Sequence, residues 1–142
     1  MEIVNFSEKF LDDIVKIEKQ SFLNPWTKEM LLGSANNSVV KFKVLNENEI
    51  VAGYYIISIV ADETEILDIA VNPSFRRRTF GRIMLTDIKK ESIYEQSKVI
   101  FLEVYQNNTA ALNLYKSFGF EEIAIRKKYY KSEDAFILRY TL

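Results

Sequence analysis

The chain of 142 residues contains no cysteine and no histidine. Without cysteine it can form no disulfide, no thiolate metal site and no cysteine nucleophile. Without histidine it also lacks the commonest general base and the commonest metal ligand. Any acid–base chemistry must therefore come from Asp, Glu, Tyr or Lys, and we expect no metal site.

Three further absences bear on the setting of the protein. The formal net charge is −1, so no general basicity indicates a nucleic-acid partner. No apolar run approaches the roughly 20 residues of a membrane-spanning helix, and the N-terminus has no signal-peptide pattern. We therefore expect a cytoplasmic protein without nucleic-acid or membrane partners. With 48% hydrophobic residues, residues 1–142 are expected to form one domain with its own core.

Hydrophobic periodicity predicts a mixed α/β fold. β-branched and aromatic runs predict strands at residues 2–5, 39–45, 50–60, 65–71, 99–104, 120–130 and 135–140. Helical spacing predicts helices from Ser7 to about Gln20 and at residues 28–32, 81–95 and 109–118, with caps at Ser7, Thr27 and Asn108 and stops near Gly33 and at Gly119. The predicted order is β-α-α-β-β-β-α-β-α-β-β. The short connections favour antiparallel pairing of the strands within 39–71, and the helix after 65–71 favours parallel pairing with 99–104.

The most informative segment is residues 65–85, EILDIAVNPSFRRRTFGRIML. It passes from a strand through three consecutive arginines into a helix. The first N–H groups of a helix and its dipole favour negative charge, so this arrangement suggests a phosphate-bearing ligand. The Walker and dinucleotide patterns are both absent, because the only glycines are at positions 33, 53, 81 and 119. Taken alone, three consecutive arginines are more typical of a solvated basic turn than of a binding site.

Four motifs in order resemble the GNAT acetyltransferases. The acetyl-CoA signature [QR]-x-x-G-x-[GA] is matched by Arg76 at its first position and Gly81 at its last. FLEVYQNNTAALNLYKSFGF at 101–120 resembles the second hallmark of the family, with these residues in register: Glu103, Asn108, Ala111, Leu114, Tyr115, Gly119 and Phe120. The segments FLNPWT at 22–27 and RKKYYKSEDAFIL at 126–138 are similar to the RimI-type ribosomal-protein alanine N-acetyltransferases. The resemblance covers essentially the whole chain and implies a GNAT-like sheet flanked by helices.

One residue departs from the family pattern. Thr79 stands where the family usually has glycine. Glycine lets the backbone approach a pyrophosphate without a Cβ, and a β-branched residue tolerates positive φ badly. If φ at position 79 is negative, Thr79 costs little and its hydroxyl can donate to phosphate. If φ is positive, we expect cofactor binding to be weakened.

The resemblance implies direct acetyl transfer from acetyl-CoA to an amine. The implied cofactor-binding residues are the strand residues Ile69, Ala70 and Val71, the loop and helix residues Arg76, Arg77, Arg78, Thr79, Phe80, Gly81 and Arg82, and Asn108. The implied general base is Glu103, because partial burial inside the apolar strand FLEV would raise the pKa of its carboxylate. The alternative is an outward-facing residue at a strand end. The implied general acid is Tyr115, and its alternative is a core tyrosine beside Leu112 and Phe118.

The acceptor is implied by the RimI-type motifs alone. It would be a protein N-terminal amine, with a ribosomal protein as the expected partner, bound by residues 22–27 and by Tyr129 and Tyr130. Those aromatic residues are equally consistent with ordinary packing on the sheet. Two other functions stay open: acetylation of a small-molecule amine, and a non-catalytic acyl-CoA-binding domain, which Thr79 would suit.

Overall fold

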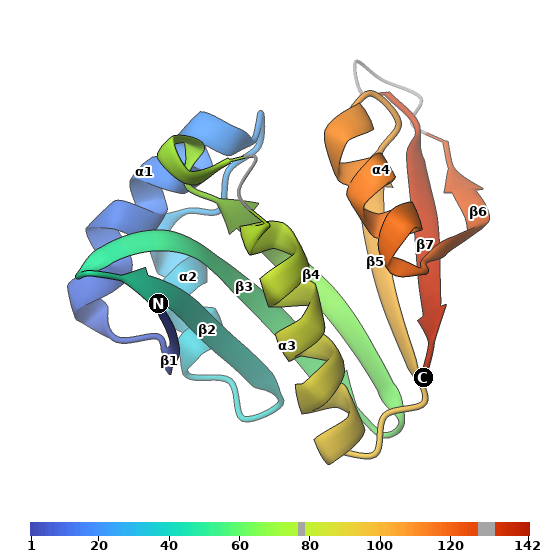
Figure 1. Ribbon diagram of the computed structural model, residues 1–142, viewed down its shortest axis with the longest axis horizontal. Helices are drawn as coiled ribbons and strands as arrows, with labels where there is room; N and C mark the ends of the chain where they lie inside the picture. Colours follow the sequence, from blue (N-terminus) through green and yellow to red (C-terminus); the bar gives the residue numbers. More distant parts are fainter. Residues whose placement is uncertain (77–78, 128–132) are drawn as a thin grey trace. The chain divides into compact units, whose positions relative to one another are not determined.

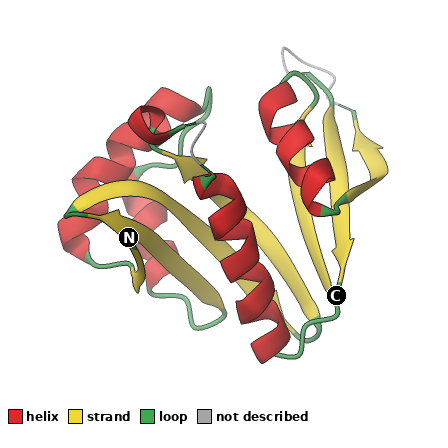
Figure 2. Ribbon diagram, in the orientation of Figure 1, coloured by secondary structure: helices red, strands yellow, loops and turns green. Residues whose placement is uncertain are grey.

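The computed structural model describes residues 1–76, 79–127 and 133–142. Its strands are β1 (Glu2–Asn5), β2 (Val40–Glu47), β3 (Ile50–Val60), β4 (Glu63–Val71), β5 (Val99–Tyr105), β6 (Glu121–Arg126) and β7 (Ala135–Thr141). Its helices are α1 (Leu11–Ser21), α2 (Lys28–Ala35), α3 (Phe80–Tyr94) and α4 (Thr109–Phe118), with 3-10 turns η1 (Glu8–Phe10) and η2 (Pro73–Phe75). Figures 1 and 2 show these elements. Their order is the predicted one, and the mixed α/β fold is confirmed.

The strands form one sheet in the order β1-β2-β3-β4-β5-β7-β6. The β1–β2 and β2–β3 pairs are antiparallel, as are β5–β7 and β6–β7. The neighbours β3 and β4 are joined by the turn 61–62, which is too short for parallel pairing. The pair β4–β5 is parallel, as predicted, and its ladder comprises Glu63↔Val99, Thr64↔Ile100 and Glu65↔Phe101.

The chain divides into two compact units. Unit 1 contains residues 1–58 and 67–84, and unit 2 contains residues 59–66 and 85–142. The core of unit 1 consists of apolar side chains from η1, α1, α2 and strands β2–β4: Phe10, Leu11, Ile14, Ile17, Leu31, Phe42, Val44, Val51, Tyr54, Ile56 and Ala70. Unit 2 has its own aromatic cluster, in which the rings of Phe118, Phe120 and Tyr140 contact one another at centroid distances of 5.4–6.2 Å. The expectation of a single domain stays a prediction.

Two predicted helix boundaries are wrong. Helix α2 continues through Gly33 to Ala35, because one glycine in a helix costs only about 1 kcal/mol. The helix ends where the Asn36 side chain donates to the Leu32 carbonyl at 3.2 Å. Ser7 makes no side-chain cap; its carbonyl accepts from Phe10 N–H in a 3-10 turn, and α1 begins only at Leu11.

Other boundaries agree with the sequence or shift slightly. Thr27 caps α2 by accepting from Met30 N–H at 3.2 Å, as predicted. Helix α3 begins at Phe80, one residue before the predicted start. The strand predicted at 120–130 is shorter, because β6 ends at Arg126 and Lys127 is not in a strand. Positions 128–130 lie outside the described residues.

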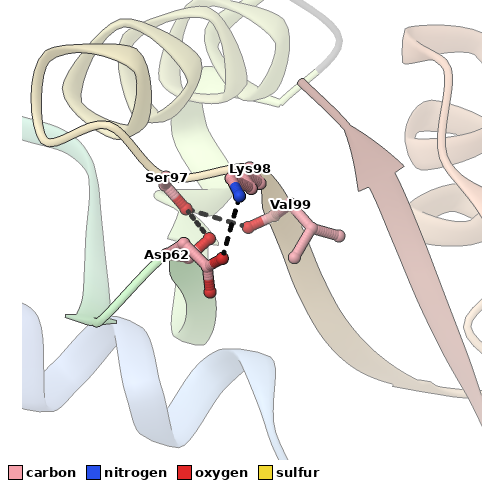
Figure 3. Close-up of polar contacts among 4 residues, drawn as sticks. All are labelled: Asp62, Ser97, Lys98 and Val99. Atoms are coloured by element: carbon pink, nitrogen blue, oxygen red, sulfur yellow. Dashed lines mark hydrogen bonds and ion pairs between the residues drawn. The ribbon is translucent and has the colours of Figure 1, made fainter.

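A polar cluster joins the starts of β4 and β5 inside unit 2 (Figure 3). The Ser97 hydroxyl lies 3.1 Å from the carbonyls of both Asp62 and Val99, and the Lys98 ammonium lies 3.6 Å from the Asp62 carboxylate. The Lys98 N–H also donates to the Asp62 carbonyl at 2.6 Å. These contacts hold the β3–β4 turn against the start of β5, and so they help to set the register of the parallel ladder.

Candidate active site

The turn that follows β4 is anchored to β3 by Asn72. Its backbone N–H donates to the Ala52 carbonyl at 2.8 Å, and its side-chain amide donates to the Val51 carbonyl at 2.8 Å. Its side-chain oxygen accepts from Ser74 N–H at 3.0 Å. Asn72 therefore fixes the path of the chain from the strand into the arginine loop. Sequence analysis did not single it out, although Asn-Pro is a common turn-forming pair.

Gly53 brings β3 unusually close to the predicted cofactor strand. A Cβ at position 53 would lie 2.8 Å from the Ala70 carbonyl oxygen, closer than real Cβ contacts allow. The contact is with backbone, which cannot give way as a flexible side chain could. Glycine at this position is therefore required for the present spacing between β3 and residues 69–71.

The arginine loop is described only in part. Arg76 is exposed, and its guanidinium donates to the Ser21 hydroxyl at 3.2 Å, at the end of α1. Arg77 and Arg78, which were also predicted to bind the cofactor, lie outside the described residues. Phe75 and Phe80 pack edge to face on either side of this loop, with ring centroids 5.6 Å apart.

Thr79 has a φ of 42°, in the left-handed region. The sequence left both signs of φ open, and the structure shows the positive one. A non-glycine residue in this region costs about 1–2 kcal/mol, and branching at Cβ adds to the crowding. Thr79 is thus a strained residue directly before α3.

Replacing this residue tests the strain. We expect Thr79→Gly to raise the free energy of unfolding by about 0.5–1 kcal/mol, the relief of strain less the greater entropy of glycine in the unfolded chain. Urea denaturation measures the change. Thr109→Gly is a matched control, because Thr109 is exposed and lies at the start of α4, where glycine is expected to destabilise. Equal losses in both variants would contradict a strained Thr79.

The start of α3 suits a phosphate group. The first turn of this 15-residue helix contains no acidic residue. The first hydrogen bond of the helix runs from Ile83 N–H to the Thr79 carbonyl, at 3.0 Å. The N–H groups of Phe80, Gly81 and Arg82 precede it in the first turn, where a helix has no carbonyl of its own to accept from them. A donor set of this kind, with arginine charge nearby, is suited to an anionic group such as a pyrophosphate.

In unit 2, Glu103 lies on the exposed side of β5. Burial alternates along the strand, with Ile100, Leu102 and Val104 buried and Glu103 exposed. Its carboxylate is 35% exposed and accepts from the Arg126 guanidinium at 2.9 Å. The side chain is thus neither fully exposed nor in the core, because it extends from the side of β5 opposite to Leu102 and Val104. An exposed ion pair of this kind contributes about 1 kcal/mol or less to stability, so Glu103 can separate from Arg126 at little cost in free energy.

Tyr115 and Asn108 belong to α4. Tyr115 is 7% exposed and packs edge to face against Phe120, with ring centroids 5.8 Å apart. It therefore has the core packing that was the alternative to an acid role, although the two are compatible. Asn108 caps the helix, because its side-chain oxygen accepts from Ala111 N–H at 3.3 Å. This cap was predicted from the sequence.

The end of α4 depends on Gly119, which has a φ of 125°. Its N–H lies within hydrogen-bond distance of the Tyr115 and Lys116 carbonyls, and Phe120 N–H donates to the Tyr115 carbonyl at 3.0 Å. A Cβ at this position would lie 2.9 Å from the Tyr140 ring. The helix end that holds Tyr115 in place therefore requires glycine.

The structure gathers the predicted residues into two groups. Ile69, Ala70, Val71 and the described loop residues belong to unit 1, whereas Glu103, Asn108 and Tyr115 belong to unit 2. Tyr129 and Tyr130 lie outside the described residues. Among residues 1–76, 79–127 and 133–142 there is no group of three or more acidic side chains placed to hold a metal ion. None of the helices in that part of the chain is both long and apolar enough to cross a bilayer.

The structure contains two buried carboxyl groups that the sequence analysis did not identify. Glu18 on α1 is 0% exposed and Asp68 on β4 is 8% exposed. The signal was present in the spacing, because Glu18 follows Ile14 by four residues on the buried face of the helix. Asp68 likewise lies two positions from each of the buried residues Ile66 and Ala70, on the same face of β4.

Comparison with known proteins agrees with the fold. The model of the acetyltransferase (GNAT) family matches residues 11–120. The ribosomal protein bS18-alanine N-acetyltransferase of Salmonella typhimurium is 34% identical over 127 residues, 87% of this chain and 85% of that protein. The enzyme of the same name from Haemophilus ducreyi is 32% identical, over 89% of this chain and 87% of that protein. The crystal structure of the ribosomal-protein-S18-alanine N-acetyltransferase from Escherichia coli has a TM-score of 0.90 and 29% identity, covering 99% of this chain and 92% of that one.

Proposed function

The chain belongs to the acetyltransferase (GNAT) family, and on that premise we propose that it transfers acetyl from acetyl-CoA to the N-terminal α-amine of a protein. The proposed acceptor is a ribosomal protein that begins with alanine. The observation that carries this proposal is the similarity, over 87% of the chain, to an enzyme named for that acceptor. Direct transfer agrees with the absence of cysteine, since no acyl-enzyme on sulfur can form.

The β4–α3 segment is the proposed binding site for acetyl-CoA, which would supply the acetyl group as a thioester. The main-chain groups of Ile69, Ala70 and Val71 would hold the pantetheine arm in the manner of an added strand. In the described part of the chain, the ladder between β4 and β5 comprises residues 63–65 and 99–101, so residues 69–71 are not among its pairs. The loop and helix N–H groups, with Arg76 to Arg78 and Arg82, would bind the pyrophosphate, and Asn108 would contact the cofactor while capping α4.

Glu103 is the proposed general base and Tyr115 the proposed general acid. Glu103 would take a proton from the acceptor ammonium, directly or through water, so that the nitrogen lone pair can form the new C–N bond. As the C–S bond breaks, the Tyr115 hydroxyl would donate its proton to the sulfur, and the proton that the nitrogen loses on becoming an amide would restore the hydroxyl through solvent. A phenol with a reference pKa near 10 is protonated at neutral pH and can protonate a thiolate, whose reference pKa is about 8.5.

An N-terminal amine suits this site better than lysine. Its reference pKa is near 8, against about 10.4 for lysine, so roughly a tenth is already neutral at pH 7. A single carboxylate therefore suffices as base. Residues 22–27 would contact the acceptor peptide, and Leu23 in that segment is 97% exposed.

Acetyl transfer to peptides tests the proposal. We expect turnover on a synthetic peptide that begins with alanine and none on the same peptide with a blocked N-terminus, measured by mass spectrometry with acetyl-CoA as donor. Turnover on a polyamine but on no peptide would favour a small-molecule acceptor. Calorimetric binding of acetyl-CoA with no transfer to any amine would instead show a binding domain.

A further inference from the structure

A buried polar cluster in unit 1 has no part in the mechanism above. It consists of Glu18 on α1, Tyr54 on β3 and Asp68 on β4. The Glu18 carboxylate accepts from the Tyr54 hydroxyl at 2.5 Å through one oxygen, and from the backbone N–H of Trp26 at 2.8 Å through the other. A fully buried carboxylate is costly in an apolar core unless hydrogen bonds compensate for its lost hydration. The hydrogen bonds that compensate for burying Glu18 connect it to Tyr54 on β3, to Asp68 on β4 and to the loop that contains Trp26.

Two members of the cluster, Asp68 and Tyr54, have raised pKa values. Burial is the main reason that the pKa of Asp68 is raised to about 9, with added contributions from a hydrogen bond to Glu18 and from the charge of Glu18. Burial, with the charges of Asp68 and Glu18, also raises the pKa of Tyr54 above its ordinary value. Tyr54 and a neutral Asp68 can therefore both act as donors. Asp68 Oδ2 nevertheless has no hydrogen-bond partner, so the network retains an unused polar atom beside the predicted cofactor strand.

The loop that Glu18 holds is the proposed acceptor-binding segment, residues 22–27. It is anchored at both ends: Ser21 accepts from Arg76 at 3.2 Å, and Thr27 caps α2. Between these points, the bond from Trp26 N–H to Glu18 ties the segment to the core. Leu23 and Asn24 lie between the anchors and are exposed. The positions of these two residues therefore depend on the Glu18 carboxylate.

We propose that Glu18 is a positioning residue for the acceptor: through Trp26 it fixes the loop that receives the peptide, and through Tyr54 and Asp68 it joins that loop to β4 immediately before residues 69–71. This inference rests on the proposed function, because it takes residues 22–27 as the acceptor-binding loop. Glu18 touches neither reacting group. Its effect is on where the loop lies, and so on peptide binding rather than on acetyl-CoA binding.

Substitution of Glu18 with a side chain of similar volume tests the proposal. Glu18→Met fills the same space but cannot accept from Trp26 N–H. We expect it to raise the KM for an alanine-initiated peptide about tenfold, with less than a twofold change in the KM for acetyl-CoA. Glu18→Gln retains an amide oxygen that can accept from Trp26 N–H, so this variant should keep most of the affinity for the peptide.

A second measurement is independent of activity. Trp26 is the only tryptophan in the chain and is partly buried against the core. In Glu18→Met its fluorescence should shift to the red and its quenching by acrylamide should rise, whereas Glu18→Gln should resemble the wild type. If Glu18→Met does not fold, Tyr54→Phe is measured instead, because it removes the hydroxyl that donates to the Glu18 carboxylate. Its quenching by acrylamide is expected to lie between that of the wild type and that of a protein with a freed loop.

Ser92→Ala is the matched control for loss of a buried polar contact. Ser92 is fully buried in unit 2 and accepts from the Thr64 hydroxyl at 2.8 Å. Its removal should lower stability without changing Trp26 quenching or the KM for the peptide. Unchanged quenching in Glu18→Met, or an equal rise in both KM values, would overturn the proposal. If the wild type acetylates no peptide, the proposed function fails, while the quenching still decides whether Glu18 holds the loop.

Discussion

Glu103→Gln is expected to lower kcat for an alanine-initiated peptide by about 100-fold or more at pH 7. General acid–base catalysis contributes about 10²–10⁴-fold, and glutamine cannot accept the proton of the ammonium group. The residual activity should rise with pH through about 8, because the α-amine then loses its proton to solvent. Steady-state kinetics between pH 6 and 9.5 measure both effects. The KM for acetyl-CoA should change little.

The control for this experiment is Glu121→Gln, a variant that loses a similar exposed ion pair elsewhere in unit 2. Glu121 is an exposed carboxylate on β6 that pairs with Arg139 at 3.3 Å, as Glu103 on β5 pairs with Arg126. Glu121→Gln should leave kcat unchanged, and both variants should lose about 1 kcal/mol of stability or less. Equal kcat in the two variants would show that Glu103 is only a surface residue, the alternative that its exposure keeps open.

Asp68→Asn is expected to remove a large pH dependence of stability. In the unfolded chain Asp68 titrates near 3.8, and in the folded protein burial and Glu18 raise its pKa to about 9. Between these values the folded state binds the extra proton, so stability falls as pH rises, by up to about 1.4 kcal/mol per pH unit from this group. Asparagine is neutral throughout and can still donate to Glu18. The variant should therefore be more stable than the wild type at pH 8, by a margin that grows toward pH 9.

Urea denaturation at several pH values between 5 and 9 measures this margin. Asp62→Asn is the matched control, because Asp62 is exposed and pairs with Lys98 on the surface of unit 2. Its stability should follow the pH dependence of the wild type. If the stability of Asp68→Asn showed the same pH dependence as the wild type, protonation of Asp68 would make no contribution to stability. Because Tyr54 belongs to the same cluster and its pKa is also raised, the Asp68→Asn comparison should be repeated in Tyr54→Phe to separate the titrations of Asp68 and Tyr54.

Local signals in the sequence predicted local structure well. Thr27 and Asn108 cap their helices as expected, because a cap joins a side chain to an N–H group only three residues away. The antiparallel β2–β3 pair and the parallel β4–β5 pair follow from connection lengths that the sequence displays. The stop near Gly33 was wrong because a glycine in a helix is a small cost that neighbouring contacts override.

Contacts between distant residues were beyond the sequence. For Glu103, the sequence left open both a partly buried base and an outward-facing residue, and it did not show the ion pair with Arg126, 23 residues further along the chain. Glu18 and Asp68 are separated by 49 intervening residues, and no periodicity within either element shows that they share a cluster. Long-range contacts of this kind are set by how elements pack, which a local pattern does not contain.

The sequence by itself determined the family and the order of strands and helices. The tertiary structure decided the conformation of Thr79. Its φ of 42° follows from neither its own preference nor that of its neighbours, since a β-branched residue disfavours this region. The chain must turn between β4, which Asn72 ties to β3, and the first residue of α3, and these two fixed ends leave Thr79 in a conformation that its sequence alone would avoid.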